Sequence, residues 1–190
     1  MSVRGEGWAE PWVFPLPWPP LADLDAQVGL RPWGAGEGDA DTLAAAWQDP
    51  EVARWTAVPP DTSVESARRW IRGEESRRAQ GLAMDLVISP LRDARIVLGE
   101  VGLVVIEPEK RWAEIGYWLA AEARGAGRAS AATKAFAGWA LRELPIDRLV
   151  ARTRPDNPKA GAVAERAGLA RAGELDDGTI VWVLDRPGRR

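Results

Sequence analysis

The sequence predicts an α/β domain with a mixed, mostly antiparallel central sheet that is flanked by helices. Three β-rich runs, at 84–89, 96–106 and 112–120, follow one another with turn residues between them, as in an antiparallel meander. A Gly–Arg loop, a helix-forming run at 128–144 and a further β-rich run at 147–153 come next. Since a strand, a helix and a second strand in this order make a β-α-β unit, we expect one at the centre of the sheet.

Residues 1–27 are interpreted as an N-terminal arm, ahead of a domain that spans 28–190. Five prolines in 8-WAEPWVFPLPWPPL-21 oppose both helix and strand pairing, so the arm is expected to be extended. Large apolar side chains are costly to leave in water, and the arm should therefore pack on the domain or on a second subunit. The side chains in question are Trp8, Trp12, Phe14 and Trp18.

The other elements are predicted from helical spacing, capping residues and β-rich runs. Asp39 is a candidate N-cap for one helix, Thr62 and Glu65 form a capping-box pattern before the next, and Pro158 suits a helical first turn. These elements are a strand at 28–33, helices at 39–48, 62–79 and 158–168, a short helical turn and proline-broken loop at 49–61, a hairpin at 171–179, and a strand at 179–184.

The amino-acid composition excludes several classes of function. The chain has 190 residues, a net charge of −3 and no long apolar run, which argues against nucleic acid and membrane as main partners and for a cytoplasmic protein. It has no Cys and no His, so disulfides, thiolate nucleophiles, imidazole bases and the usual zinc sites are excluded, and no metal is expected. Proton transfer must therefore use Asp, Glu, Lys, the single residue Tyr117, water or the backbone.

The loop 122-EARGAGRAS-130 combines two glycines with two arginines immediately before a helix. Glycines let backbone N–H groups turn toward one point, and a helix N-terminus adds unpaired N–H groups, so a phosphate group is the expected ligand. The Walker phosphate-binding motif is absent from the sequence. The stretch 125-GAGRAS-130 matches the Rossmann dinucleotide-binding motif except for its last residue, although the Rossmann fold needs a parallel sheet. A third reading is R-x-x-G-x-A, carried by Arg124, Gly127 and Ala129.

Around this loop the chain resembles the GNAT N-acetyltransferase superfamily, and within it the RimJ/RimL-like group. The resemblance covers about residues 28 to 184, and the arm lies outside it. The blocks that carry it are 30-LRPW-33, 47-WQDPEVARWTAVP-59, 114-EIGYWLAAEARGAGRASAA-132 and 151-ARTRPDNPKAGAVAERAGL-169.

This resemblance implies the GNAT fold and acyl-coenzyme A, here acetyl-coenzyme A, as donor. The loop would hold the pyrophosphate through its backbone N–H groups, and the pantetheine arm would pair with the exposed edge of the strand before it. The backbone N–H near Trp118 would stabilise the oxyanion of the transition state. The residues implied in donor binding are Tyr117, Trp118, Leu119, Arg124, Gly125, Ala126, Gly127, Arg128, Ala129, Ser130 and Asn157.

Transfer to an amine requires removal of a proton, because free amines are mostly protonated at neutral pH. Glu114 is the first candidate for the base, with Glu100 second. Relatives often place Ser or Tyr on the helix that follows Asn157, whereas 160-AGAVAERAG-168 contains neither, so the leaving thiolate is left without a dedicated acid.

The acceptor site is expected between the 47–60 loop and the strand at 112–120, with Trp55, Thr56 and Val58 as its wall and Glu100 nearby. The predicted function is direct acyl transfer to a primary amine, either a protein N-terminus or a small molecule. A non-catalytic protein that binds or senses coenzyme A on the same fold is the alternative, and a homodimer is possible in either case.

Overall fold

The computed structural model describes residues 12–188, which fold around one mixed sheet of eight strands in the order β1-β2-β3-β4-β5-β6-β8-β7. The strands are β1 (Ala22–Asp23), β2 (Val28–Pro32), β3 (Ala83–Pro90), β4 (Gly99–Glu107), β5 (Trp112–Leu119), β6 (Arg148–Thr153), β7 (Ala170–Glu174) and β8 (Ile180–Asp185). The helices are α1 (Asp39–Gln48), α2 (Pro50–Trp55), α3 (Val64–Ala79), α4 (Arg128–Glu143) and α5 (Pro158–Arg166), with a 3₁₀ turn, η1 (Ala121–Ala123), before α4.

The pairing of the strands confirms the predicted fold class. Strands β2 to β5 form an antiparallel meander, and β5 pairs with β6 in parallel through the crossover helix α4. Strand β8 returns antiparallel to β6, and β7 completes the predicted hairpin with it. The β-α-β unit therefore lies within an otherwise antiparallel sheet.

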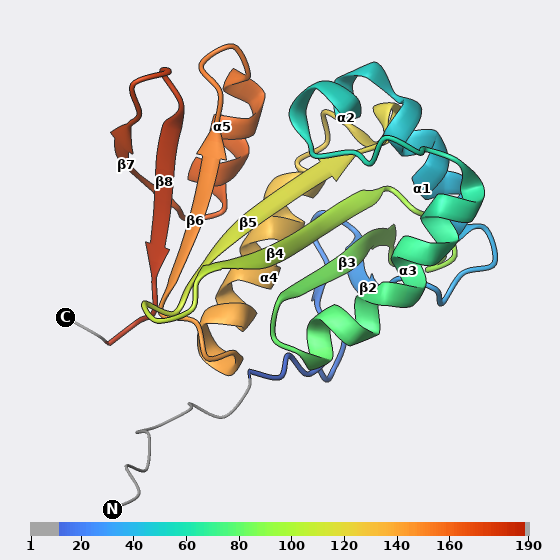
Figure 1. Cartoon of the computed structure of the whole chain (residues 1–190), viewed down its shortest axis with the longest axis horizontal. Helices are drawn as coiled ribbons and strands as arrows, with labels where there is room; N and C mark the ends of the chain where they lie inside the picture. Colours follow the sequence, from blue (N-terminus) through green and yellow to red (C-terminus); the bar gives the residue numbers. More distant parts are fainter. Residues whose placement is uncertain (1–11, 189–190) are drawn as a thin grey trace, which may run out of the picture.

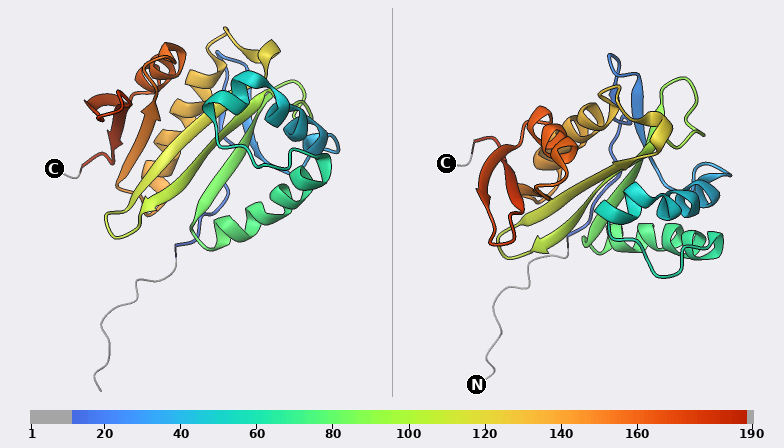
Figure 2. Two further views of the ribbon diagram at one scale, coloured as in Figure 1. Left: turned by 45° about the horizontal axis from the view of Figure 1, so that its top comes forward. Right: turned by 90° about the horizontal axis from the view of Figure 1, so that it is seen from above.

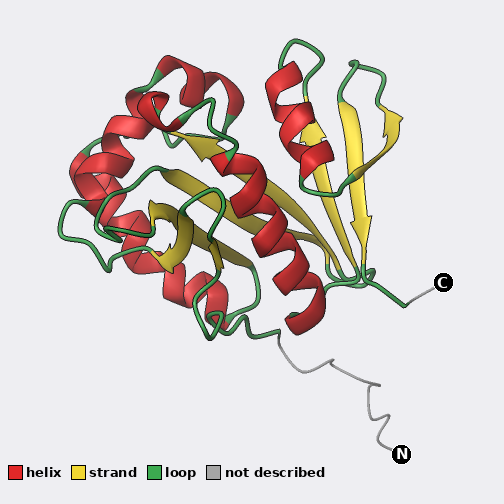
Figure 3. Cartoon of the chain, turned by 180° about the vertical axis from the view of Figure 1, so that it is seen from behind, coloured by secondary structure: helices red, strands yellow, loops and turns green. Residues whose placement is uncertain are grey.

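The helices cover both faces of the sheet (Figures 1 and 2). Helices α1, α2 and α3 lie on one face, while α4 and α5 lie on the other, where Figure 3, which views the molecule from behind, shows α4 crossing in front of the meander. Each helical layer has its own apolar core. Phe136 and Leu144 belong to the α4 core, whereas Trp33, Trp47 and Trp118 belong to the core beneath α1 to α3.

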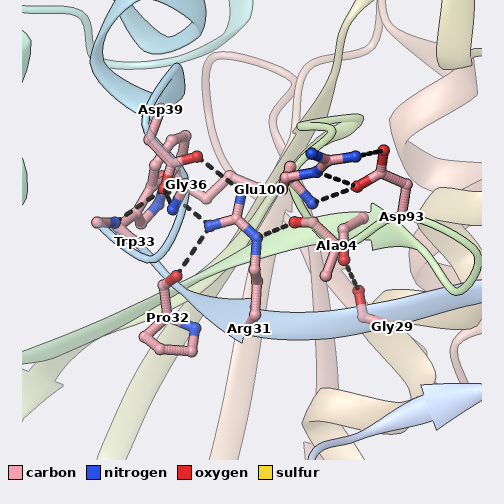
Figure 4. Close-up of polar contacts among 12 residues, drawn as sticks. Gly29, Arg31, Pro32, Trp33, Gly36, Asp39, Asp93, Ala94 and Glu100 are labelled. Carbon is pink, nitrogen blue, oxygen red and sulfur yellow. Dashed lines mark hydrogen bonds and ion pairs between the residues drawn. The ribbon is translucent and has the colours of Figure 1, made fainter.

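Two predicted helix caps are wrong, and in both cases other contacts use the side chains. Helix α1 has Gly38 at its N-cap, while Asp39, only 1% exposed, receives two N–H groups of the Arg31 guanidinium at 2.7 and 2.8 Å (Figure 4). Such a bidentate, charge-assisted pair satisfies a buried carboxylate better than one backbone N–H does. Helix α3 is capped by Ser63, which accepts the Ser66 N–H at 3.2 Å, instead of by Thr62.

The arm is described from residue 12 onward, and part of it packs as predicted. Phe14 is fully buried, its N–H donates to the Arg78 carbonyl at 3.0 Å, and its own carbonyl accepts from the Arg78 guanidinium at 2.9 Å. Trp18 does not pack on the domain, because it is 89% exposed, and the predicted packing on a second subunit stays a prediction. Trp8 lies outside the described residues, and β1, within the range assigned to the arm, pairs with β2.

Candidate active site

Strands β5 and β6 begin side by side and then separate (Figure 1). Their pairing runs only from Trp112–Arg148 to Glu114–Val150. The second half of β5, from Gly116 to Leu119, has β4 on one side and this gap on the other. An unpaired strand edge offers backbone donors and acceptors to an extended ligand.

The ladder with β4 decides which backbone groups of β5 face the gap. Ala120 donates its N–H to the Leu98 carbonyl, and the Trp118 carbonyl lies 2.1 Å from where a Cβ on Gly99 would stand. Both observations turn the polar backbone groups of Ala120 and Trp118 toward β4. Because this direction alternates along a strand, Tyr117 and Leu119 direct their backbone groups into the gap.

The loop at the end of β5 leads into the N-terminus of α4. Gly125 and Gly127 have φ of +87° and +73°, a left-handed conformation that other residues adopt at a cost, and Gly127 is the N-cap of the helix. The first helical bond joins the Ala131 N–H to the Gly127 carbonyl, so the N–H groups of the first helical residues, 128–130, have no acceptor within the helix. With no acidic residue in this first turn, its positive end is open to an anion.

Both arginines of the loop make contacts within the protein. Arg124 donates from Nε to the Leu119 carbonyl at 2.9 Å and forms an ion pair of 2.7 Å with Asp49, the N-cap residue of α2. Arg128 donates to the Ala123 carbonyl at 3.2 Å. Arg124 therefore joins the loop to α2 as well as lining the cavity described next, a contact that the sequence motif did not reveal.

A cavity of about 620 Å³ extends from the loop along the open edge of β5. It contains every predicted donor residue except Ala126, and it also reaches Trp55 and Thr56 of the predicted acceptor wall. The residues around it are Glu51, Val52, Trp55, Thr56, Tyr117, Trp118, Leu119, Arg124, Gly125, Gly127, Arg128, Ala129, Ser130, Asn157, Lys159, Ala160, Ala162, Val163 and Arg166.

Helix α5 forms the far wall of this cavity. Asn157 caps the helix, its side-chain oxygen accepting the Ala160 N–H at 3.2 Å. The Tyr117 hydroxyl crosses the gap and donates to the Ala160 carbonyl at 2.6 Å, while burial raises the pKa of this phenol. Tyr117 therefore stays neutral and ties β5 to α5.

A second cavity, of about 550 Å³, lies over the sheet face beneath α2 and α3. Trp55 and Trp70 stand beside it, and three acidic residues, Asp85, Glu100 and Glu114, line it. The two cavities meet at the gap, where they share Trp55, Thr56, Tyr117, Trp118, Asn157 and Ala160. Val58, predicted as part of the acceptor wall, packs instead against the core beneath α1 to α3.

Trp55 stands at the mouth that both cavities share. The Arg54 guanidinium lies 4.4 Å from its ring centre and that of Arg154 lies 6.0 Å away, so cations approach the ring as expected for a cation–π site. Asp156 pairs with both arginines, at 3.0 and 3.3 Å. This cluster connects α2 to the segment between β6 and α5.

The two predicted carboxylates have different surroundings. Glu114 pairs with Arg152 of β6 at 2.5 Å. Glu100 is partly buried and accepts the indole N–H group of Trp33 at 2.8 Å (Figure 4) and that of Trp118 at 3.2 Å. Burial is the main cause that raises the pKa of Glu100 to about 8, with the charge of Asp85 adding to it and the two indoles opposing it. At neutral pH Glu100 is thus mostly protonated.

Asp85 is the site residue that sequence reasoning missed. Burial raises its pKa to about 6, while Arg77 lowers it and Glu74 raises it further. The only signal in the sequence is its place as a single charged residue in the apolar run 84-MDLVIS-89. A charge inside a strand that is otherwise buried needs a partner or a function.

Within residues 12–188, no group of three or more His, Cys, Asp or Glu is arranged to hold a metal ion. No helix in that range is both long enough and apolar enough to cross a membrane.

Known proteins share both the sequence pattern and the fold. A Bacillus licheniformis protein described as the uncharacterized N-acetyltransferase p20 is 30% identical over 139 residues, 73% of this chain and 78% of that protein. The ribosomal-protein-serine acetyltransferase of Escherichia coli K12 is 31% identical over 113 residues, 60% of this chain and 62% of that protein.

Among solved structures, the ribosomal L7/L12 α-N-protein acetyltransferase RimL in complex with coenzyme A superposes with a TM-score of 0.71 at 22% identity, covering 87% of this chain and 97% of that one. Mycobacterium smegmatis RimJ, in complex with a coenzyme A disulfide, gives 0.71 at 23% identity over 87% and 85% of the two chains. These likenesses concern the fold. The family model of the acetyltransferase (GNAT) domain matches residues 27–170, and the chain therefore belongs to the GNAT acetyltransferase family.

Proposed function

We propose that this chain transfers an acetyl group from acetyl-coenzyme A directly to a primary amine, with one substrate in each of the two connected cavities. The observation that carries the proposal is their meeting at the unpaired end of β5. Bringing both reactants to one point converts a bimolecular reaction into an effectively unimolecular one.

The donor cavity suits a long ligand with an anionic group at one end. The open N–H groups at the start of α4 would bind the pyrophosphate, with Arg128 as a charge partner. Arg124 would join it by turning from Asp49 or by binding both groups. The pantetheine arm would then run along the free edge of β5, toward the mouth beside Trp118.

The acetyl carbonyl needs a hydrogen-bond donor for the negative charge that develops on its oxygen. The resemblance assigns this role to the backbone near Trp118. Since the ladder turns the Trp118 N–H toward β4, we assign the role to the neighbouring N–H groups of Tyr117 or Leu119, which face the gap. Asn157, at the shared mouth, would contact the arm or ordered water.

Glu114 is proposed as a proton acceptor that acts through water. It lines the acceptor cavity, and β5 places it two residues from Gly116 on the same face. Its ion pair with Arg152 holds the carboxylate in place. Because the Tyr117 hydroxyl donates to the Ala160 carbonyl, we assign no dedicated acid to the leaving thiolate.

The acceptor is proposed to be a protein N-terminus or a small-molecule amine. One relative is named for acetylation of a ribosomal-protein serine, and a solved neighbour of 18% identity is a spermidine N-acetyltransferase from Vibrio cholerae in complex with coenzyme A and spermine. Both classes are represented among the proteins that this chain resembles.

The test is release of free coenzyme A thiol by the purified full chain from acetyl-coenzyme A. The acceptors are tripeptides with N-terminal Ser or Ala, n-butylamine and spermidine, with mass spectrometry to locate the acetyl group. We expect thiol release that depends on at least one amine and matches the acetylated product. If coenzyme A binds by calorimetry but no amine accelerates thiol release, the proposal fails and a non-catalytic coenzyme A-binding protein is supported.

A further inference from the structure

One row of residues crosses three strands beneath the acceptor cavity. Asp85 of β3 is paired in register with Gly102 of β4, and Gly102 is paired with Gly116 of β5. Residues directly opposite one another share a face of the sheet, and all three line the acceptor cavity. A carboxylate at one end of the row therefore faces two glycines, the second of which is at the gap.

The Asp85 side chain reaches over the first glycine. A Cβ on Gly102 would stand 2.1 Å from Asp85 Oδ1, so the carboxylate occupies the place that any other residue there would fill. A Cβ on Gly116 would meet nothing within 4 Å. Since neighbouring strands lie about 4.8 Å apart, Oδ1 is roughly one strand spacing from the open space above Gly116.

Charged groups around Asp85 come from α3 and β4. Oδ2 lies 3.7 Å from an Arg77 nitrogen, and the buried Glu74 accepts the Asp85 N–H at 3.5 Å and pairs with Arg78 at 3.6 Å. Glu100 of β4 adds a further carboxyl on the same face. With its pKa near 6, Asp85 is mostly ionised at neutral pH and is still basic enough to take a proton there.

The other carboxyl groups of the cavity are engaged differently. Glu114 is bound to the permanent cation of Arg152, and Glu100, mostly neutral, accepts two indole N–H groups. The exposed fraction of the Asp85 side chain is 17%, so it is partly buried and open to the cavity. Asp85 is thus the ionised carboxylate that points along the row toward the gap.

We propose that Asp85 holds the ammonium group of the acceptor above Gly116 through one water molecule and takes its proton before acetyl transfer. The inference rests on the proposed function and assigns it a catalytic residue. One proton passes from nitrogen to the Asp85 carboxylate. The amine lone pair then forms the N–C bond, the C–S bond breaks, and its electron pair leaves on sulfur. The second proton lost by nitrogen passes through water to Glu114 and from there to the thiolate, and Asp85 returns its own proton to solvent.

The same geometry defines the acceptor as a primary amine on a slender chain. The floor beneath the nitrogen is bare glycine backbone, and the side chains of Trp118 and Glu114 flank Gly116 along β5 on the same face. A substituent on the nitrogen would occupy the space that the two glycines leave. We therefore expect n-butylamine to be a better acceptor than its N-methyl derivative.

Two variants test the role of Asp85 by different routes. Asp85→Asn keeps the shape and removes the base, whereas Gly102→Ala keeps the carboxylate but adds a Cβ where Oδ1 lies, so that the side chain must move. The matched control is Gly173→Ala in β7, where a Cβ meets nothing within 4 Å and which lies outside both cavities. Coenzyme A affinity of each variant, measured by calorimetry, reports on folding.

We expect Asp85→Asn to lower kcat/KM for the amine by ~10²–10⁴-fold, with an unchanged Kd for coenzyme A. In the wild type kcat/KM should fall as the pH drops through about 6, because the base becomes protonated, and Asp85→Asn should lack this limb. Gly102→Ala should also lower kcat/KM for the amine. When it is combined with Asp85→Asn, it should lower kcat/KM by less than about a further twofold, since the effects of coupled sites are not additive.

Binding of n-butylamine to the coenzyme A-saturated chain separates this inference from the proposed function. A Kd that weakens at least about tenfold in Asp85→Asn, a change of 1.4 kcal/mol, supports the ammonium site even if no acceptor is turned over. An equal Kd in wild type and Asp85→Asn overturns the inference, as does a wild-type pH profile of kcat/KM in Asp85→Asn.

Discussion

Gly127→Asp places a carboxylate where the proposed pyrophosphate site is formed. Gly127 is the N-cap of α4 with φ of +73°, and a Cβ there would meet nothing within 4 Å. The added side chain therefore has room, and its cost to folding is conformational. A residue other than glycine in this region costs about 1–2 kcal/mol, partly offset by about 0.3–1 kcal/mol for a negative charge near a helix N-terminus.

The expected effect on donor binding is larger than this effect on folding. Two unit charges 4 Å apart repel by about 1 kcal/mol in water and about 4 kcal/mol at the effective dielectric of a protein surface. The variant carboxylate would also compete for the free N–H groups of α4. We expect the Kd for coenzyme A to rise at least about tenfold, while the melting temperature falls by only about 2–4 °C.

Isothermal titration with coenzyme A and a thermal melt without ligand measure the two effects separately. Gly178→Asp is the matched control, because φ there is +80°, the nearest atom to a Cβ lies at 3.4 Å, and the residue lines neither cavity. The control should melt lower with an unchanged Kd. A Kd for Gly127→Asp within about twofold of wild type would refute the assignment of the loop, because the electrostatic term alone exceeds that change.

Three further predictions concern single groups. Glu114→Gln should lower kcat by ~10²-fold or more with little change in the KM for acetyl-coenzyme A; turnover within about twofold of wild type across the pH range would make Glu114 a structural partner of Arg152. Burial raises the pKa of Glu100 from 4.5 to about 8, so the folded chain binds this proton more tightly than the unfolded chain does, and the free energy of unfolding falls as pH rises between those values. Glu100→Gln should therefore flatten the dependence of melting temperature on pH. An unchanged slope would contradict the raised pKa of Glu100. Phe14→Ala should cost about 3–5 kcal/mol of stability, because Phe14 is fully buried, whereas Trp18→Ala, at an exposed site, should leave the melting temperature nearly unchanged. Equal melting temperatures of the two variants would show that the arm does not stabilise the domain. Size-exclusion chromatography of a chain lacking residues 1–20 tests the expected dimer.

The elements that could be predicted from the sequence are those fixed by local patterns. Helix α1 spans Asp39–Gln48 as predicted, and the meander, α4 and the hairpin all form where periodicity and turn residues indicate. The failures are at helix caps. Asp39 has the right chemistry for an N-cap, but Arg31, eight residues earlier, takes its carboxylate. A capping rule cannot anticipate a partner that only the folded strand β2 brings into reach.

The donor half and the acceptor half of the site also differ in how far local sequence patterns can predict them. The donor half is nearly contiguous, because a strand edge, a glycine loop and a helix N-terminus follow one another between Gly116 and Ser130. Its chemistry can therefore be read from spacing. The acceptor half is formed by strand register. Asp85 meets Gly102 only in the observed pairing, and a shift of one residue would turn its carboxylate to the other face of the sheet.

Three carboxyl groups line the acceptor cavity, and their surroundings rather than their identity give them different roles. Two indole donors hold Glu100 as a mostly neutral group in the cavity wall, and the Arg152 guanidinium holds Glu114. Asp85 has an ion-pair distance of 3.7 Å to Arg77, longer than a hydrogen bond, with its other oxygen over bare glycine. The carboxylate that takes the first proton from the ammonium group must be ionised, accessible and incompletely paired before substrate arrives. Asp85 meets these three conditions, and it does so because β4 has a glycine, and no side chain, at the position opposite.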